Sequence, residues 1–449
     1  MITVSNLEVQ YGKRVLFKDV NLKFTPGNCY GVIGANGAGK STFLKVLSGE
    51  VTPTRGSVAF GPHERLSVLK QDHFEYDECT VLDTVLMGHQ PLWSLMQEKN
   101  ALYAKADFSE EDGIRAGELE EKFAEMDGWN AESDAAELLS GLGIREALHY
   151  EKMGSLNAKE KVRVLLAQAL FGKPDNLLLD EPTNNLDLAS VVWLEDFLMD
   201  YEGTVLVVSH DRYFLDRTVS RVIEVLDGKA EFYSGNYSFY AVEKERRYQE
   251  RMKQYLKEQA KIQQLEKAAE QMHLWAFMGN DALHKRAFSM EKRIERMRTT
   301  AKPTKAKKMD ARFASREFKG DEVLQFRGVT KAFDQRTLFS DVYLRVEGGE
   351  RIALIGENGT GKTTLLNMLT GRESCDGGSI RLGPSVKWAY LEQVIHFDHP
   401  ERNLVDTMLY AKKNITPQSA RNRLAAYQFQ GEDVFKSVSV LSGGELSRL

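Results

Sequence analysis

Two stretches of this chain combine closely spaced glycines with a lysine and a hydroxyl residue. The first reads GANGAGKST and the second GENGTGKTT, and each follows an apolar run typical of a strand. Glycines let successive backbone N–H groups converge on a phosphate, and the N-terminus of the following helix adds positive potential. The lysine is expected to reach the β- and γ-phosphates, and the next hydroxyl, from Ser41 or Thr363, to bind Mg²⁺. The predicted nucleotide-binding residues are Gly34, Asn36, Gly37, Gly39, Lys40, Ser41 and Thr42 in the first copy, and Gly356, Asn358, Gly359, Gly361, Lys362, Thr363 and Thr364 in the second.

Two adjacent acids follow three leucines in the segment NLLLDEP. The leucines predict a buried parallel strand, which would place the acids at its carboxyl end, where α/β sheets bind ligands. Asp180 is predicted to hold Mg²⁺ through water and Glu181 to polarise the attacking water. An Asp-Glu pair is more often a simple turn, but a second apolar strand ends in LVVSHD and supplies His210 as a donor to the γ-phosphate. The loop TNNLD places Asp187 where it could cross a dimer interface.

The chain is a tandem duplication. An offset of 322 residues relates three pairs: Gly34 and Gly356, Tyr11 and Phe333, and Gln71 and Gln393. Tyr11 and Phe333 could be core aromatics, but their shared offset favours stacking on an adenine ring. Two P-loop copies, each in a strand–loop–helix context, predict the α/β class with tandem nucleotide-binding domains.

A further repeat has a different offset. LNAKE at 156–160 and LSGGE at 441–445 are 285 residues apart, so the first copy holds 37 extra residues. We place this insertion at about 88–130, where acids outnumber bases ten to four, and predict a helical hairpin there. In LSGGE, a Gly-Gly pair behind a serine at the start of a helix is suited to holding an anion.

Charge divides the chain into three parts: a first domain at 1–236, a linker at 237–320 and a second domain at 321–449. Residues 239–320 carry 21 Lys/Arg against 11 Asp/Glu, although the whole chain has a net charge of -5. Apolar residues at helical spacing predict two antiparallel helices with a tip near Gly279, followed by the basic tether TAKPTKAKK. The alternative is a solvated charged linker, which such runs usually are.

Several other classes of protein are disfavoured. No apolar run approaches the length of a membrane span, and the polar N-terminal residues do not fit a signal peptide. The three cysteines lie far apart without metal-ligand spacing, which indicates reduced thiols and a cytoplasmic protein.

Taken together, these motifs resemble the ATP-binding cassette ATPases. GANGAGKST corresponds to the Walker A motif, Gln71 to the glutamine loop, NLLLDEP to the Walker B motif, His210 to the switch histidine and LSGGE to the signature motif. Two cassettes with a charged helical linker and no membrane segment resemble the ABC-F family of ribosome-associated translation factors, and most closely its YbiT-like subgroup.

The resemblance implies that each ATP lies between the Walker motifs of one cassette and the signature motif of the other. Gln71 would then act in catalysis and in Mg²⁺ binding, and Gln393 would bind Mg²⁺ at the second site. Signature residues Ser442, Gly443, Gly444 and Glu445 would contact the ATP held by Lys40. The second site would use LNAKE, which lacks both glycines, and its Walker B motif would fall near position 465. We therefore expect a fragment of a longer protein, with an incomplete second cassette, apolar surface left uncovered beside its P-loop strand, and slow hydrolysis.

For function, the resemblance implies binding to the ribosomal E site in the closed, ATP-bound form, and release on hydrolysis. The linker would reach towards the P-site tRNA and rRNA, and the acidic insertion would suit a basic partner such as the L1 stalk protein. Neither DNA nor a membrane is expected as a partner. Two alternatives stay open at this point: the ATPase subunit of a transporter, and a non-catalytic ATP-dependent scaffold. Antibiotic protection, ribosome assembly and rescue of elongation are not distinguished.

Overall fold

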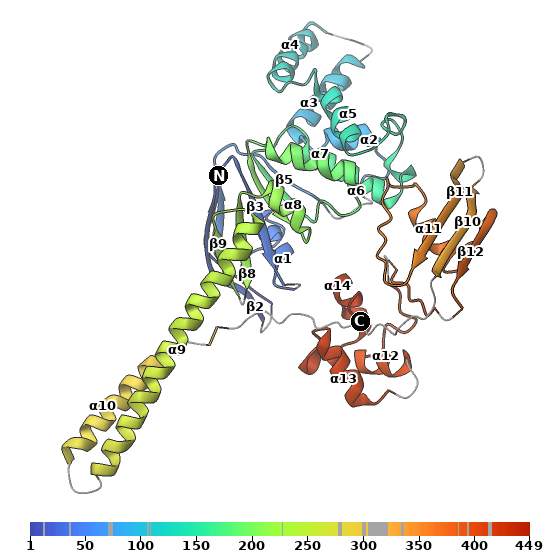
Figure 1. Cartoon of the computed structure of the whole chain (residues 1–449). Coiled ribbons are helices and arrows are strands. Elements are labelled where there is room, and N and C mark those ends of the chain that lie inside the picture. The colour runs from blue at the N-terminus through green and yellow to red at the C-terminus, as the bar shows by residue number, and fades with distance from the viewer. Residues whose placement is uncertain are drawn as a thin grey trace. The chain divides into compact units, whose positions relative to one another are not determined.

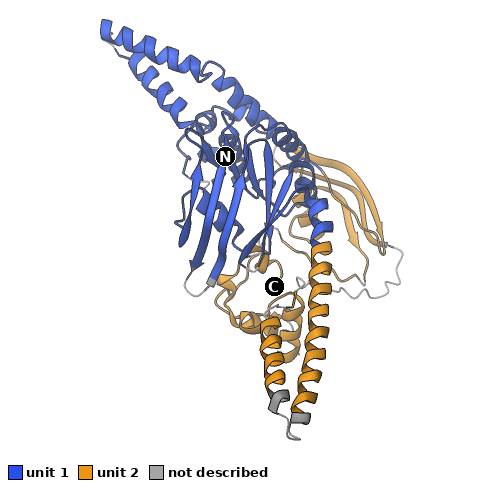
Figure 2. Cartoon of the chain, turned by 90° about the vertical axis from the view of Figure 1, so that its left-hand side faces the viewer, with its two compact units in different colours: residues 1–244, 356–358 blue, residues 245–355, 359–449 orange. Residues whose placement is uncertain are grey.

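A computed structural model describes residues 1–11, 14–35, 37–70, 75–105, 107, 109–226, 228–276, 281–298, 302–303, 322–333, 336–384, 386–392, 395–411 and 415–449 (Figure 1). The predicted site residues Asn36, Gln71 and Gln393 lie outside these ranges, as do the side chain of Tyr11, the predicted tip near Gly279 and most of the basic tether. The chain forms two compact units, which are described separately (Figure 2). The first comprises Met1–Lys244 with Gly356–Asn358, and the second comprises Glu245–Ile355 with Gly359–Leu449.

The first unit is built around a six-stranded sheet with the strand order β5-β6-β7-β3-β8-β9. Its strands are β3 (Asn28–Gly34), β5 (Leu66–Val68), β6 (Asn176–Asp180), β7 (Thr204–Val208), β8 (Arg221–Leu226) and β9 (Lys229–Tyr233). All neighbouring pairs are parallel except β8 and β9. Every residue of β7 is buried, as expected for a strand covered on both faces. The predicted α/β class is confirmed.

A second, antiparallel sheet has the order β2-β1-β4, with β1 (Ile2–Tyr11), β2 (Arg14–Phe24) and β4 (Arg55–Phe60). The buried side chains of β1 alternate at Ile2 and Val4, then resume at Leu7 and Val9. This change of phase coincides with a register shift between Val4 and Leu7, because an extra residue moves the following side chains to the other face. These side chains share a core with helix α1 (Lys40–Leu47) and one face of the central sheet.

A group of helices shares one apolar core with the other face of the central sheet. They are α2 (Val81–Leu86), α3 (Gln90–Tyr103), α4 (Glu110–Glu125), α5 (Ala131–Gly141), α6 (Ala158–Leu170), α7 (Leu188–Met199) and α8 (Arg212–Thr218). Two of them, α3 and α4, extend outward from the sheet (Figure 1). Helices α3 and α4 fall within the predicted insertion and are joined by an ion pair between Arg115 and Glu98 at 2.7 Å. Ser109 and Asp112 form a capping box at the start of α4, which explains where the second insertion helix begins.

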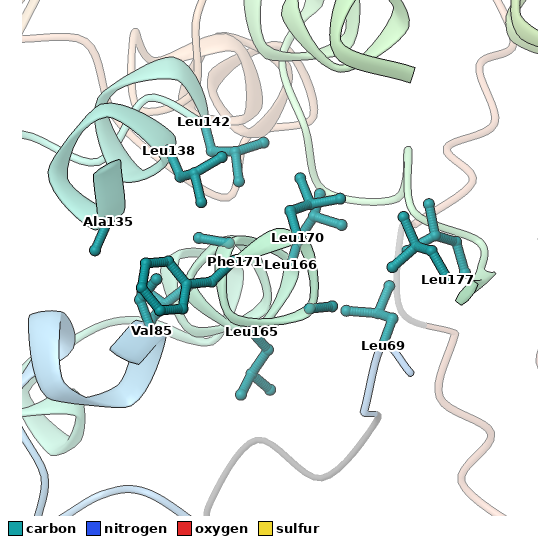
Figure 3. Packing of buried hydrophobic residues seen from close by; sticks show 14 of the residues in the cluster. Leu69, Val85, Ala135, Leu138, Leu142, Leu165, Leu166, Leu170, Phe171 and Leu177 are labelled. Atoms are coloured by element: carbon teal, nitrogen blue, oxygen red, sulfur yellow. The ribbon is translucent and has the colours of Figure 1, made fainter. Parts of the chain in front are cut away.

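Helix α6 lies at the centre of the largest core. Figure 3 shows Leu165, Leu166 and Leu170 of α6, with Phe171 directly after the helix, surrounded by apolar side chains of other elements. We expect Leu166→Ala to lower the free energy of unfolding by about 2–5 kcal/mol, because a buried leucine loses its transfer energy and leaves a cavity. Denaturant-induced unfolding measures the effect. Leu188→Ala is the matched control, since Leu188 is exposed and its truncation should change stability by no more than about 0.5 kcal/mol. Equal effects of the two substitutions would contradict this account of the core.

The linker region contains α9 (Tyr237–Ala276) and α10 (Asp281–Met297). Ile262 and Ala269 of α9 are buried, as are Ala287 and Ile294 of α10, and these residues belong to the predicted apolar repeats. His273 pairs with Glu291 at 3.1 Å, and Arg298 pairs with Glu266, so the two helices run antiparallel. None of the helices that the structure describes has both the length and the apolar character needed to cross a bilayer.

The second P-loop copy begins with an antiparallel sheet of order β11-β10-β12. Its elements are β10 (Glu322–Phe333), β11 (Arg336–Glu347), α11 (Lys362–Leu369), β12 (Gly377–Leu382), α12 (Leu404–Ala411), α13 (Pro417–Ala426) and α14 (Gly443–Leu446). Residues 350–356, the counterpart of β3, form no strand, and Ile352, Leu354 and Ile355 are 54%, 46% and 76% exposed. In the first unit β3 is held between β7 and β8, and the described part of the second unit places no strand beside 350–356. The expected uncovered apolar surface is therefore present.

Candidate nucleotide-binding and hydrolysis site

The first P-loop joins the end of β3 to the start of α1. Gly37 has a φ of 75° and Gly39 a φ of 97°, a left-handed conformation that residues with a Cβ adopt only at a cost. Lys40 is the first residue of α1, and its Nζ donates to the carbonyl oxygens of Gly34 at 3.0 Å and Ala35 at 3.2 Å. These bonds hold the ammonium group over the loop, where a phosphate could replace the carbonyls as its partner. Ser41 is exposed in the first turn of α1, followed by the half-buried Thr42.

The two acids lie at the carboxyl end of β6, next to β7. The backbone N–H of Glu181 donates to the carbonyl of Val208 at 2.8 Å, which continues the parallel pairing one residue beyond the strand. Glu181 nevertheless has a φ of 52°. A non-glycine residue in this region stores about 1 kcal/mol or more of strain, and such strain is concentrated at functional sites. The sharp turn directs the chain into the TNNLD loop, where Asn184 N–H donates to the Glu181 carbonyl at 3.1 Å.

His210 follows β7 in the chain and contacts Glu181. Its backbone N–H donates to Glu181 Oε2 at 3.3 Å, and its Nε2 lies 3.6 Å from Glu181 Oε1. Burial raises the pKa of the Glu181 carboxyl, an effect opposed by His210. Burial likewise lowers the pKa of Lys40, while the charges of Glu181 and Asp180 oppose that change. The structure therefore brings the predicted Lys40, Asp180, Glu181 and His210 to one edge of the central sheet.

This arrangement has the parts needed for phosphoryl transfer to water. The loop and Lys40 can bind the phosphates, and a carboxylate with a raised pKa is better matched to accepting a proton near neutral pH. Ser41 and Asp180 offer a hydroxyl and a carboxylate oxygen, and oxygen donors are the ligands that Mg²⁺ prefers.

One residue of this region was not predicted from the sequence. Arg163 is buried on α6, and its guanidinium lies 3.4 Å from the carboxylate of Asp187 and 3.3 Å from the Leu142 carbonyl. Asp187 in turn caps α7 by accepting from the Ser190 N–H at 3.0 Å. Arg163 thus supports the loop that follows Glu181. An arginine within the apolar stretch VRVLLAQAL was the available signal, because a buried charge requires a partner.

The second P-loop repeats the geometry of the first. Gly359 has a φ of 81° and Gly361 a φ of 94°, and α11 begins at Lys362. Thr363 is exposed in the first turn of that helix, ahead of the half-buried Thr364, and Gly356 and Asn358 are exposed. Phe333 is 46% exposed, with Lys331 Nζ 4.8 Å from its ring centroid. This exposure excludes a core role for Phe333, and the Lys331 ammonium lies against its ring.

The two signature segments start helices in the same way. In the second unit, Glu445 accepts from the Ser442 backbone N–H at 2.9 Å and from its hydroxyl at 2.6 Å. Gly443 and Gly444 are exposed in the turn between them. In the first unit, Asn157 accepts from the Glu160 N–H at 3.0 Å, and Asn157 N–H donates to the Glu160 carboxylate at 3.1 Å. The capping arrangement is therefore kept in LNAKE, whereas the two glycines are replaced by residues with side chains.

Comparison with protein families gives matches along the chain. A family model described as ABC transporter matches residues 17–184 and 339–449. A second model, also described as ABC transporter, matches residues 223–313, which include all of α9 and all of α10.

Individual relatives match over the full length of the chain. The uncharacterized ABC transporter ATP-binding protein YkpA of Bacillus subtilis (strain 168) is 45% identical, covering 100% of this chain and 83% of the relative. The probable ATP-binding protein YbiT of Escherichia coli O157:H7 is 38% identical, covering 100% and 84%. The energy-dependent translational throttle protein EttA of Mycobacterium tuberculosis (strain ATCC 25618 / H37Rv) is 32% identical, covering 100% and 80%.

Proposed function

The chain belongs to the ABC-F family of ATP-binding cassette ATPases, in its YbiT-like subgroup, and on this premise we propose that it is a translation factor. It binds the ribosomal E site in the closed, ATP-bound form and leaves when ATP is hydrolysed. The observation that carries this proposal is the helical pair α9 and α10, inserted in sequence between two P-loop segments. The similarity to a protein named a translational throttle also supports a role in translation.

The surface of α10 supports RNA as the contact of the linker. Lys285, Arg286, Lys292 and Arg293 are exposed, while the apolar side of the helix faces α9 through Ala287 and Ile294. Cationic side chains on a rigid helix neutralise phosphates without reading sequence. We propose P-site tRNA and rRNA as the phosphates in question.

The insertion is negatively charged, in contrast to the positively charged surface of α10. Helix α4 carries Glu110, Glu111 and Asp112 in its first turn, and most of its other acids are exposed. An acidic helix repels RNA, so a basic protein such as the L1 stalk protein is the proposed partner of the insertion.

At the first site, we propose that Lys40 binds the β- and γ-phosphates of ATP, and that Glu181 orients the attacking water. His210 would contact the γ-phosphate. Ser41 and Asp180 would hold Mg²⁺, which supplies charge neutralisation on the phosphates when bound. Ser442, Gly443, Gly444 and Glu445 would complete this site, Gln71 and Gln393 would serve the two metal positions, and Tyr11 and Phe333 would stack on adenine. We also propose that the first domain ends at residue 236 and the linker at residue 320. The proposed location of the protein is the cytoplasm.

Co-sedimentation with purified ribosomes tests the function. The chain carrying Glu181→Gln, which should retain ATP, is expected to sediment with ribosomes at least several-fold more in ATP than in ADP. Adding Lys40→Met should remove the difference, because the phosphates lose their main cation. Equal sedimentation in both nucleotides would indicate a scaffold. Binding to membrane vesicles with no binding to ribosomes would instead indicate a transporter subunit.

A further inference from the structure

Helix α8 connects the hydrolysis site to the linker helix. It begins two residues after His210, and Asp211 caps it by accepting from the backbone N–H groups of Tyr213 at 2.9 Å and Phe214 at 3.2 Å. The helix is seven residues long, which corresponds to about 10 Å at 1.5 Å per residue. Such a short capped helix moves as one body, so its two ends cannot reorient independently.

The far end of α8 is bonded to the first turn of α9. Asp216 accepts from the backbone N–H of Ser238 at 2.7 Å, and the carbonyl of Asp216 accepts from Asn236 Nδ2 at 3.3 Å. Asn236 itself accepts from the N–H of Phe239 at 3.1 Å. The first turn of a helix has backbone donors with no partner inside the helix. One of those donors is satisfied by a side chain of α8, which fixes the starting direction of α9 relative to α8.

A second contact holds α9 to the central sheet. Glu224 of β8 is only 4% exposed, and it accepts from the Tyr240 hydroxyl at 2.9 Å and pairs with Lys244. Tyr233 of β9 packs edge-to-face on Tyr240 with ring centroids 5.0 Å apart. Burial and the neighbouring Glu224 raise the pKa of Tyr240, so its hydroxyl stays protonated and remains a donor. Separating α9 from β8 would leave the buried Glu224 carboxylate with only the Tyr233 hydroxyl, at 3.4 Å, as a hydrogen-bond donor, which is costly.

Helix α8 is also joined to α7, the helix that follows the TNNLD loop. Arg217 donates to the buried carboxylate of Glu195 at 2.7 Å. Both chain segments that leave the catalytic edge, one after Glu181 and one after His210, therefore converge on α8. Ion pairs and hydrogen bonds thus connect both segments to the base of α9.

We propose that α8 is a mechanical coupler, which turns a change of nucleotide at His210 and Glu181 into a change in the direction of α9. Asp216 links α8 to the first turn of α9, and Glu224 holds α9 to the central sheet. Helix α9 has 40 residues, so it extends about 60 Å from its base. A rotation of about 10° at the base moves position 264 by about 7 Å, since that position lies about 40 Å along the helix. This inference rests on the proposed function only where it concerns the effect of α9 on a bound partner. The change in the direction of α9 itself does not require a ribosome.

Distance measurement between two spin labels tests the coupler. One label is placed at Glu132, exposed on α5, and the other at Gln264, exposed on α9. The background is the full chain with Glu181→Gln to retain ATP, and with Cys79→Ser and Cys375→Ser, since these cysteines are half-buried whereas Cys29 is buried. The expected result is a shift of several ångströms in the distance distribution between the ADP and ATP states.

Asp216→Ala should reduce that shift by more than half. Asp216→Asn is the matched control, since asparagine accepts from a helical N–H as well as aspartate does, and it should keep the full shift. Glu224→Gln is a second variant: it removes the charge facing Lys244 but retains an acceptor for Tyr240, and it should also reduce the shift. An unchanged shift in both Asp216→Ala and Glu224→Gln, or no shift in the parent chain, would overturn the proposal. Because ribosomes are absent from this measurement, its outcome is separate from the co-sedimentation result.

Discussion

Replacing Glu181 with glutamine is expected to slow ATP hydrolysis at the first site by about a hundredfold or more while leaving ATP binding intact. Glutamine keeps the shape of the side chain but cannot accept a proton from the attacking water, and losing such a group typically has an effect of this size. Single-turnover hydrolysis of bound ATP measures the rate, and equilibrium binding of a fluorescent ATP analogue measures the affinity.

Glu195→Gln provides a control for the general effect of removing a buried carboxylate. Glu195 pairs with Arg217 on α8, lies outside the phosphate loop and is buried, whereas Glu181 is half-buried. It should change the hydrolysis rate much less than Glu181→Gln. A Glu181→Gln rate within twofold of the parent would remove Glu181 from the proposed catalytic role.

The linker is expected to make a large, salt-sensitive contribution to ribosome binding. Four exposed cations of α10 are changed together: Lys285, Arg286, Lys292 and Arg293, all to glutamine. Each phosphate contact contributes roughly 0.9 to the slope of log affinity against log salt for a duplex, so up to about 3.6 of the slope should be lost. Affinity for ribosomes, measured between about 50 and 200 mM salt, should fall most at low salt, where loss of phosphate contacts matters most.

A control with the same change in net charge separates local contact from overall attraction. Lys18, Lys23, Lys45 and Lys229 are exposed on the first cassette, and their joint replacement by glutamine also removes four positive charges. This control should leave most of the slope unchanged. If both variants lose the same slope, the cations of α10 act only through net charge, and the proposed RNA contact of the linker is wrong.

The sequence by itself determined the features that depend on local chemistry. A left-handed glycine such as Gly39 and a lysine directly after it occupy fixed positions in a P-loop, so spacing along the chain is enough to find them. The same holds for the strand NLLLD, whose apolar run predicts burial on both faces, and for the apolar periodicity of α9 and α10. In each case the residues that determine the local structure lie in the same short segment that adopts it.

Only the tertiary structure decided which distant groups meet. Glu181 and His210 are 29 residues apart and lie together because β6 and β7 pair in parallel register, which neither strand specifies alone. The apolar stretch around Arg163 indicates that this charge needs a partner but not which one, and the sequence around Glu224 gives no such signal. The partners of both follow from burial, because each buried charge must be paired with groups on other elements. The bond from Asp216 to Ser238 likewise depends on where α8 ends relative to α9. Because such contacts depend on packing between elements, local sequence patterns identify the groups but not their partners.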